Sequence, residues 1–186
     1  MLESHFFENS LKKEDLLRHK ESLKRLYLQS LEESDANKKG GLFEEFVRTF
    51  FRRIKGFDVE PVPLDLSWTD LDVVIFNNNE KLKDAIGPII VVQCKNRSDP
   101  ISWKIIAETL IQAIAYGNKC KTAILATTSH LTGDAKKAID LIRTRLGIGI
   151  LVIEDKDWQE YFNNSELNEE EFIYSVLKRY PEHIYK

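Results

Sequence analysis

The stretch IIVVQCK, residues 89–95, decides how the rest of the chain is interpreted. Its first four residues are apolar, which is typical of a strand covered by other elements on both faces. Gln93 and Lys95 follow, and side chains alternate along a strand, so both point to one face while Cys94 points to the other. An unpaired amide or ammonium is costly to bury. A polar pair at the end of this strand therefore indicates a functional site.

The preceding stretch TDLDVVIF, residues 69–76, supplies carboxylates next to that pair. Asp70 and Asp72 share one face of the expected strand, and Asp70 is the main rival to Asp72 as a ligand. A carboxylate and a lysine at neighbouring strand ends favour phosphodiester hydrolysis, in which a divalent cation activates water and the lysine stabilises developing charge. Mg²⁺ prefers oxygen ligands, and Asp72, the Gln93 side chain and the Cys94 backbone carbonyl can supply them.

The remaining pattern predicts helices that alternate with strands. We expect strands at 57–62, 72–77, 89–95, 121–127 and 148–153. We expect helices at 9–34, 42–55, 102–116, 133–145, 155–162 and 168–180, with a break at 37–41 where NKKGG interrupts the helical pattern. Three consecutive strands followed by β-α alternation predict an α/β fold, a mixed sheet with helices on both faces.

The first expected helix is heavily charged and has only a narrow apolar stripe. Ser10 is a candidate N-cap, and Leu16, Leu23, Leu26 and Tyr27 form the stripe. Such a stripe predicts an arm that packs either on a partner subunit or on the flank of its own domain. We therefore expect an N-terminal helical arm at 1–39, a core at 40–163 and a C-terminal helix at 164–186.

The second expected helix places one more carboxylate near the strand ends. Its apolar stripe consists of Phe43, Phe46, Val47, Phe50 and Ile54. Glu44 lies at the border of this stripe and Glu45 lies nearly opposite, so Glu44 is the better candidate to reach from the core edge into the site. Arg48, Arg52 and Arg53 lie on other flanks, where they can meet phosphates.

Composition sets the class of protein. The 186 residues are 42% apolar and 31% charged, as in a soluble globular domain. No apolar run is long enough to cross a bilayer, and the first residues do not resemble a signal peptide, so we expect a cytoplasmic protein without membrane contact. The net charge of −3 argues against coating of nucleic acid by bulk charge. Cys94 and Cys120 form no CxxC pair, which favours buried thiols over a zinc site, and His130 is a lone loop histidine.

Several motifs in order resemble one known family. They are GGLFEEFVRTFFRRIKGFDV, TDLDVVI, VVQCK, ILATTSHLTGDAKKAID and GIGILVIED, which run from about 40 to 162. This part of the chain resembles the PD-(D/E)XK nuclease superfamily, and within it the Mrr-like restriction endonuclease branch. The resemblance implies a restriction-endonuclease-like three-layer core and an endodeoxyribonuclease of the restriction or phage-defence type that depends on Mg²⁺, with Mn²⁺ as an alternative.

The resemblance also implies the residues of the site. The catalytic set is Glu44, Asp72, Gln93 and Lys95. The metal ligands are Asp72, Gln93, Glu44 and the Cys94 backbone carbonyl. From their positions, and not from the resemblance, we expect DNA contacts at Arg48, Arg52, Arg97, Trp103 and Lys104, with packing at the helix start as an equally good interpretation of Trp103.

Three alternatives stay open at this point. The same site suits a structure-specific nuclease that cuts junctions or flaps during repair. Gln93 replaces the acidic residue common in the superfamily, so the fold can also persist as a nucleic-acid-binding or assembly module with a weak site. RNA is an alternative substrate to DNA. Cutting both strands of a duplex usually takes two sites, which favours a homodimer or a partner subunit bound through the N-terminal helix.

Overall fold

The computed structural model describes residues 2–60, 64–65 and 70–179, with side chains for 13–60, 71–117 and 119–179. Its helices are α1 (Leu2–Glu32), α2 (Ala36–Phe51), α3 (Lys83–Ile86), α4 (Trp103–Ala115), the 3₁₀ turn η1 (Gly117–Lys119), α5 (Gly133–Leu146), α6 (Asp155–Asn163) and α7 (Glu169–Leu177). Its strands are β1 (Phe57–Val59), β2 (Leu64–Asp65), β3 (Asp70–Leu71), β4 (Val73–Asn77), β5 (Ile89–Lys95), β6 (Cys120–Thr127) and β7 (Gly149–Ile153).

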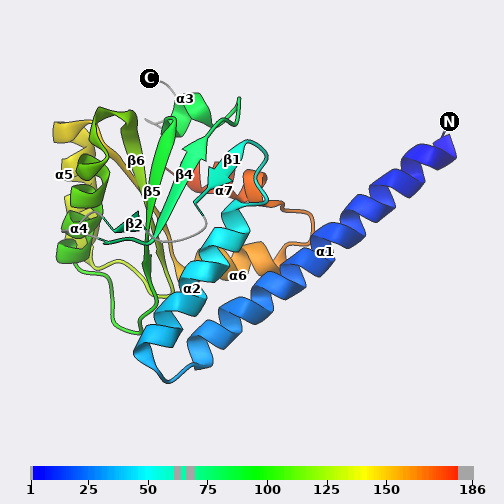
Figure 1. Cartoon of the computed structure of the whole chain (residues 1–186), viewed down its shortest axis with the longest axis horizontal. Helices are drawn as coiled ribbons and strands as arrows, with labels where there is room; N and C mark the ends of the chain where they lie inside the picture. The colour runs from blue at the N-terminus through cyan, green and yellow to red at the C-terminus, as the bar shows by residue number, and fades with distance from the viewer. Residues whose placement is uncertain (1, 61–63, 66–69, 180–186) are drawn as a thin grey trace.

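The main sheet has five strands in the order β1-β4-β5-β6-β7 (Figure 1). β1, β4 and β5 pair antiparallel, whereas β5, β6 and β7 pair parallel and are connected through α4 and α5. β5 is the central strand and is buried on both faces, with Ile90 and Val92 in one core cluster and Val91 in another, which explains its unbroken apolar run. The predicted mixed sheet is confirmed. The two-residue strands β2 and β3, which form a separate hairpin, and the one-turn helix α3 were not predicted.

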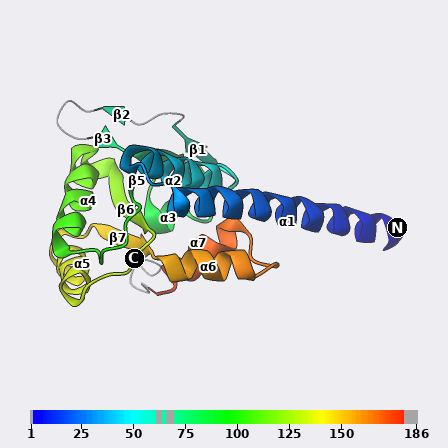
Figure 2. The ribbon, with the colours of Figure 1, turned by 90° about the horizontal axis from the view of Figure 1, so that it is seen from below.

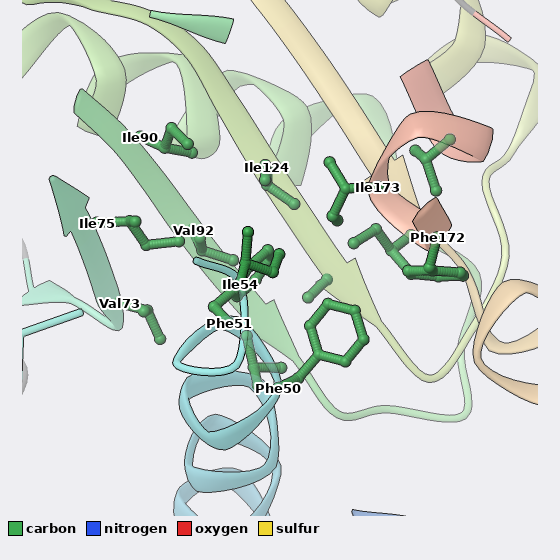
Figure 3. Packing of buried hydrophobic residues seen from close by; sticks show 14 of the residues in the cluster. Phe50, Phe51, Ile54, Val73, Ile75, Ile90, Val92, Ile124, Phe172 and Ile173 are labelled. Carbon is green, nitrogen blue, oxygen red and sulfur yellow. The ribbon is translucent and has the colours of Figure 1, made fainter. Parts of the chain in front are cut away.

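Helices cover both faces of the sheet. α4 and α5 lie on one side of the strands, and α1, α2, α6 and α7 lie on the other (Figure 2). The core on the α2 side is rich in aromatic rings, and Figure 3 shows Phe50 of α2 next to Phe172 of α7 beneath the strands. The apolar stripe that the sequence predicts for residues 42–55 is buried along its whole length, from Phe43 to Ile54. Cys94 packs on the α2 side with Val92, as strand alternation predicts.

From Lys13 onward, α1 contacts the body of the protein: Lys13 pairs with Glu166 at 2.6 Å and Asp15 pairs with Arg53 at 2.8 Å. Leu23 and Tyr27 are buried against α2, and the Tyr27 hydroxyl donates to Asp155 Oδ1 at 2.5 Å. The N-terminal part of α1 runs clear of the body (Figures 1 and 2). The stripe thus packs on the flank of its own domain, one of the two alternatives. The expected cap at Ser10 is wrong, because α1 begins at Leu2 and residue 10 lies inside it. Within the described residues, no helix combines the length and apolar character that a membrane span requires.

The break expected at 37–41 is also wrong. The chain turns earlier, where the Asp35 carboxylate caps α2 by accepting from the N–H groups of Asn37 and Lys38. α2 then runs through Gly40 and Gly41, because a good N-cap outweighs the weak helix propensity of glycine. At its other end α2 stops at Phe51, before the predicted 55.

Candidate active site

Asp72 occupies a single-residue bend between β3 and β4. The pairing of Val73 with Val92 sets Asp72 across from Gln93, at the point where β4 and β5 begin to separate. Its Oδ2 atom accepts hydrogen bonds from Gln93 Nε2 at 2.5 Å and from the Cys94 N–H at 2.6 Å. The carboxylate is therefore fixed against the end of β5. The side chain of Asp70, the rival ligand, lies outside the described residues.

The backbone of Cys94 brings an oxygen to the same place. In a strand, the N–H and C=O of one residue point to the same edge. The Cys94 N–H points at Asp72, so the Cys94 carbonyl faces this edge as well. Gln93 is 4% exposed and uses its amide nitrogen on Asp72, which leaves its amide oxygen as an acceptor. The fork between β4 and β5 thus collects carboxylate, amide and carbonyl oxygens, the donor types that a hard divalent cation prefers.

Glu44 approaches this fork from α2 together with Arg48. Arg48 Nη2 donates to the Asp72 backbone oxygen at 2.6 Å and to Glu44 Oε2 at 3.3 Å. The Glu44 side chain is 25% exposed and that of Glu45 is 48% exposed, the order that the helical wheel predicts. Arg48 was expected to meet phosphates at the surface, but its side chain is only 6% exposed and it ties α2 to the Asp72 bend.

The carboxyl groups of Glu44 and Asp72 are both harder to ionise than usual. Burial, and then the nearby Asp72 charge, raise the pKa of Glu44. Burial also raises the pKa of Asp72, although the Cys94 N–H, the Lys95 ammonium and the Gln93 amide all act in the opposite direction. Two partly buried acids that resist ionisation gain from a cation between them. The residues present therefore fit a divalent metal ion.

Lys95 completes the cluster from the end of β5. Its ammonium is partly buried and lies 4.0 Å from Glu108 Oε2 on α4. Its charge lowers the pKa of both Asp72 and Glu44, so it lies close to both. The structure thus brings together the four residues of the predicted catalytic set, from α2, the Asp72 bend and β5.

The expected DNA contacts lie at different distances from this cluster. Arg97 is in the loop after β5 and pairs with Asp99 at 3.1 Å, while Trp103 and Lys104 are exposed at the start of α4. Arg52 lies eight residues beyond Glu44, roughly 12 Å further along α2, and pairs with Glu45. Contact of these residues with DNA stays a prediction.

Asn96 is a site residue that sequence reasoning missed. Its Nδ2 atom donates to the backbone oxygens of Ser30 at 2.8 Å and Lys39 at 3.2 Å, and its Oδ1 accepts from Thr128 Oγ1 at 3.0 Å. These bonds tie the residue after Lys95 to the turn between α1 and α2. The only signal in the sequence is its place next to QCK.

No cluster of three or more His, Cys, Asp or Glu side chains in the described part of the chain is arranged to hold a metal ion. The candidate donors are two carboxylates completed by neutral oxygens. The family model described as restriction endonuclease, for the Mrr-type catalytic domain, matches residues 36–167. No curated protein and no solved structure matches the chain.

Proposed function

The chain belongs to the Mrr-type restriction endonuclease family, and we propose that it is a metal-dependent endonuclease that hydrolyses DNA through Glu44, Asp72, Gln93 and Lys95. The observation that carries this proposal is the fixed carboxylate of Asp72, held by Gln93 and the Cys94 N–H beside the Lys95 ammonium. A carboxylate held rigidly next to a lysine suits charge stabilisation at a phosphodiester.

The oxygens of Asp72, Glu44, Gln93 and the Cys94 carbonyl would hold the cation, Mg²⁺ or Mn²⁺. Such an ion lowers the pKa of a bound water and neutralises a phosphate oxygen. Lys95 offers its ammonium to the negative charge that develops on the phosphate, and Arg48 holds the Asp72 peptide in place.

Cleavage of supercoiled plasmid with Mg²⁺ or Mn²⁺ tests the proposal. Lys95→Met should lower the cleavage rate by a factor on the order of 10² or more, because a preorganised charge at the reacting phosphate is lost. Lys121→Met is the matched control, since Lys121 is an exposed lysine of β6 at the opposite end of the sheet. Absence of cleavage by the wild type, or equal cleavage by the two variants, would overturn the proposal.

Calorimetry tests the metal site without reference to activity. Mn²⁺ titrated into the wild type should release or absorb heat that Asp72→Ala abolishes, whereas Asp58→Ala should leave it unchanged. Asp58 lies on the exposed side of β1. Equal binding by all three proteins would place the cation elsewhere.

A further inference from the structure

A polar cavity opens near the candidate active site. It measures about 330 Å³ and lies at the C-terminal ends of β6 and β7. Its lining includes Lys136 of α5 and four residues from the loops after β5 and β6, namely Ser98, Thr128, Ser129 and His130. The proposed chemistry uses none of these side chains.

Hydrogen bonds connect the wall of this cavity to the segment that carries Lys95. Thr127 pairs with Lys95 in the sheet, and its hydroxyl donates to the Lys95 backbone oxygen at 2.8 Å. The next residue, Thr128, accepts from the Arg97 N–H at 3.0 Å. Because parallel strands end at the same edge, the cavity lies along the row of strand ends that begins with Lys95. A polymer bound at Lys95 can therefore extend into it.

The acidic residues of the cavity are already engaged. Glu154 Oε1 accepts from the Leu131 N–H at 2.7 Å and its Oε2 pairs with Lys156 at 2.7 Å. Asp155 Oδ1 accepts from the Tyr27 hydroxyl. Both carboxylate oxygens of Glu154 and the Oδ1 atom of Asp155 therefore have protein partners.

Donors, in contrast, are available. The Lys136 ammonium makes no ion pair or hydrogen bond with any residue that the structure describes, although its charge reaches Glu154. The hydroxyl of Ser129, which is 6% exposed, makes only a long contact of 3.4 Å to the Ser98 carbonyl. His130 adds an exposed imidazole. An ammonium, a hydroxyl and an imidazole around a small cavity suit an anion.

We propose that this cavity binds a backbone phosphate of the DNA strand next to the phosphodiester that is cleaved, with Lys136 as the charged contact. The inference rests on the proposed function. A nuclease positions its substrate mainly through phosphates, which follow each other every 3.4 Å of rise along a strand. The cavity has ample room for a phosphate group, and all of its lining side chains except Leu131 are polar or charged. Its contribution is sequence-independent and fixes the register of the strand over Lys95.

Lys136→Gln and its neighbour Lys137→Gln form a matched pair. Lys137 follows directly on α5, has an 84% exposed side chain and pairs with Asp134 outside the cavity. Binding of a fluorescent duplex of about 30 base pairs is measured by anisotropy on the whole chain, with Ca²⁺ in place of Mg²⁺, at several KCl concentrations.

Lys136→Gln should weaken binding about tenfold, and the plot of log affinity against log salt should become less steep by about one unit, because one phosphate contact is lost. Lys137→Gln should match the wild type in both affinity and the slope of the salt plot. In cleavage assays, KM should rise for Lys136→Gln while kcat stays near that of the wild type. Thermal melting of both variants checks that the fold is intact.

Two failures are distinguishable. If the wild type binds and cleaves DNA and both variants behave alike, the phosphate site is wrong and the proposed function stands. If the wild type neither binds nor cleaves DNA, the proposed function fails and the phosphate site fails with it.

Discussion

Replacing Gly40 and Gly41 together by alanine should stabilise the protein. Both residues lie inside α2, and a glycine within a helix costs about 0.5–1 kcal/mol relative to alanine. A Cβ atom built on either residue meets no other atom within 4 Å, so the alanines add no steric cost. The two terms sum to about 1–2 kcal/mol of added stability. For a chain of this size, that corresponds to a rise in Tm of roughly 2–8 °C.

Urea unfolding followed by circular dichroism measures the change, and an unchanged m-value shows that the denatured state is the same. Gly56→Ala is the control of opposite sign. Gly56 has a φ of +86°, and an added Cβ would lie 2.7 Å from the Asn79 backbone nitrogen, so this variant should lose about 1–3 kcal/mol. An alanine pair that leaves stability unchanged or lowers it would refute the reasoning, because residues 40 and 41 would then lie outside a helix.

Three further substitutions test the site and the core. Burial raises the pKa of Asp72, so its ionised form opposes folding, and wild-type stability should fall as pH rises through the pKa of the folded state. Asp72→Asn should therefore be more stable than the wild type near pH 7 by on the order of 1 kcal/mol. Thermal melts with a chelator from about pH 4 to 8 measure both effects. Asn96→Ala leaves two backbone oxygens without their donor, so it should lower the free energy of unfolding by about 1–3 kcal/mol in urea and slow cleavage. An unchanged cleavage rate would show that the loop after β5 does not need these hydrogen bonds. Phe50→Ala should cost about 3–5 kcal/mol in the same assay, because the ring is fully buried against Trp158 and Phe172, and a loss below 1 kcal/mol would contradict this packing.

The parts of the fold that sequence predicts well are those with a strong local pattern. The strand expected at 89–95 coincides with β5, since a continuous apolar run ending in polar residues has few other interpretations. The helix expected at 102–116 differs from α4 by one residue at each end. The α1–α2 turn was misplaced because two signals compete there. The NKKGG stretch looked like a break, but the Asp35 cap decides where α2 begins.

The candidate site also has some features that the sequence predicts and others that it does not. Strand alternation is local, so the common face of Gln93 and Lys95 could be predicted, and the helical wheel favoured Glu44 over Glu45 for the same reason. Contacts between segments that are distant in the sequence could not be predicted. Asn96 meets Ser30 across 66 residues of chain, and Arg48 reaches the Asp72 backbone from 24 residues away. No periodicity encodes such pairings, because they depend on how the α1–α2 hairpin docks on the sheet.

The charge balance of the site bears on how it would take up a cation. Glu44 and Asp72 carry two negative charges, and Arg48 and Lys95 carry two positive charges close to them. Gln93 adds no charge, so these side chains sum to zero when both acids are ionised, with Glu108 a further 4.0 Å from Lys95 and Glu45 3.7 Å from Arg48. A divalent cation is therefore attracted less strongly than by a site of carboxylates alone. A phosphodiester bound beside Lys95 adds the missing negative charge, so each of the two ligands should favour binding of the other.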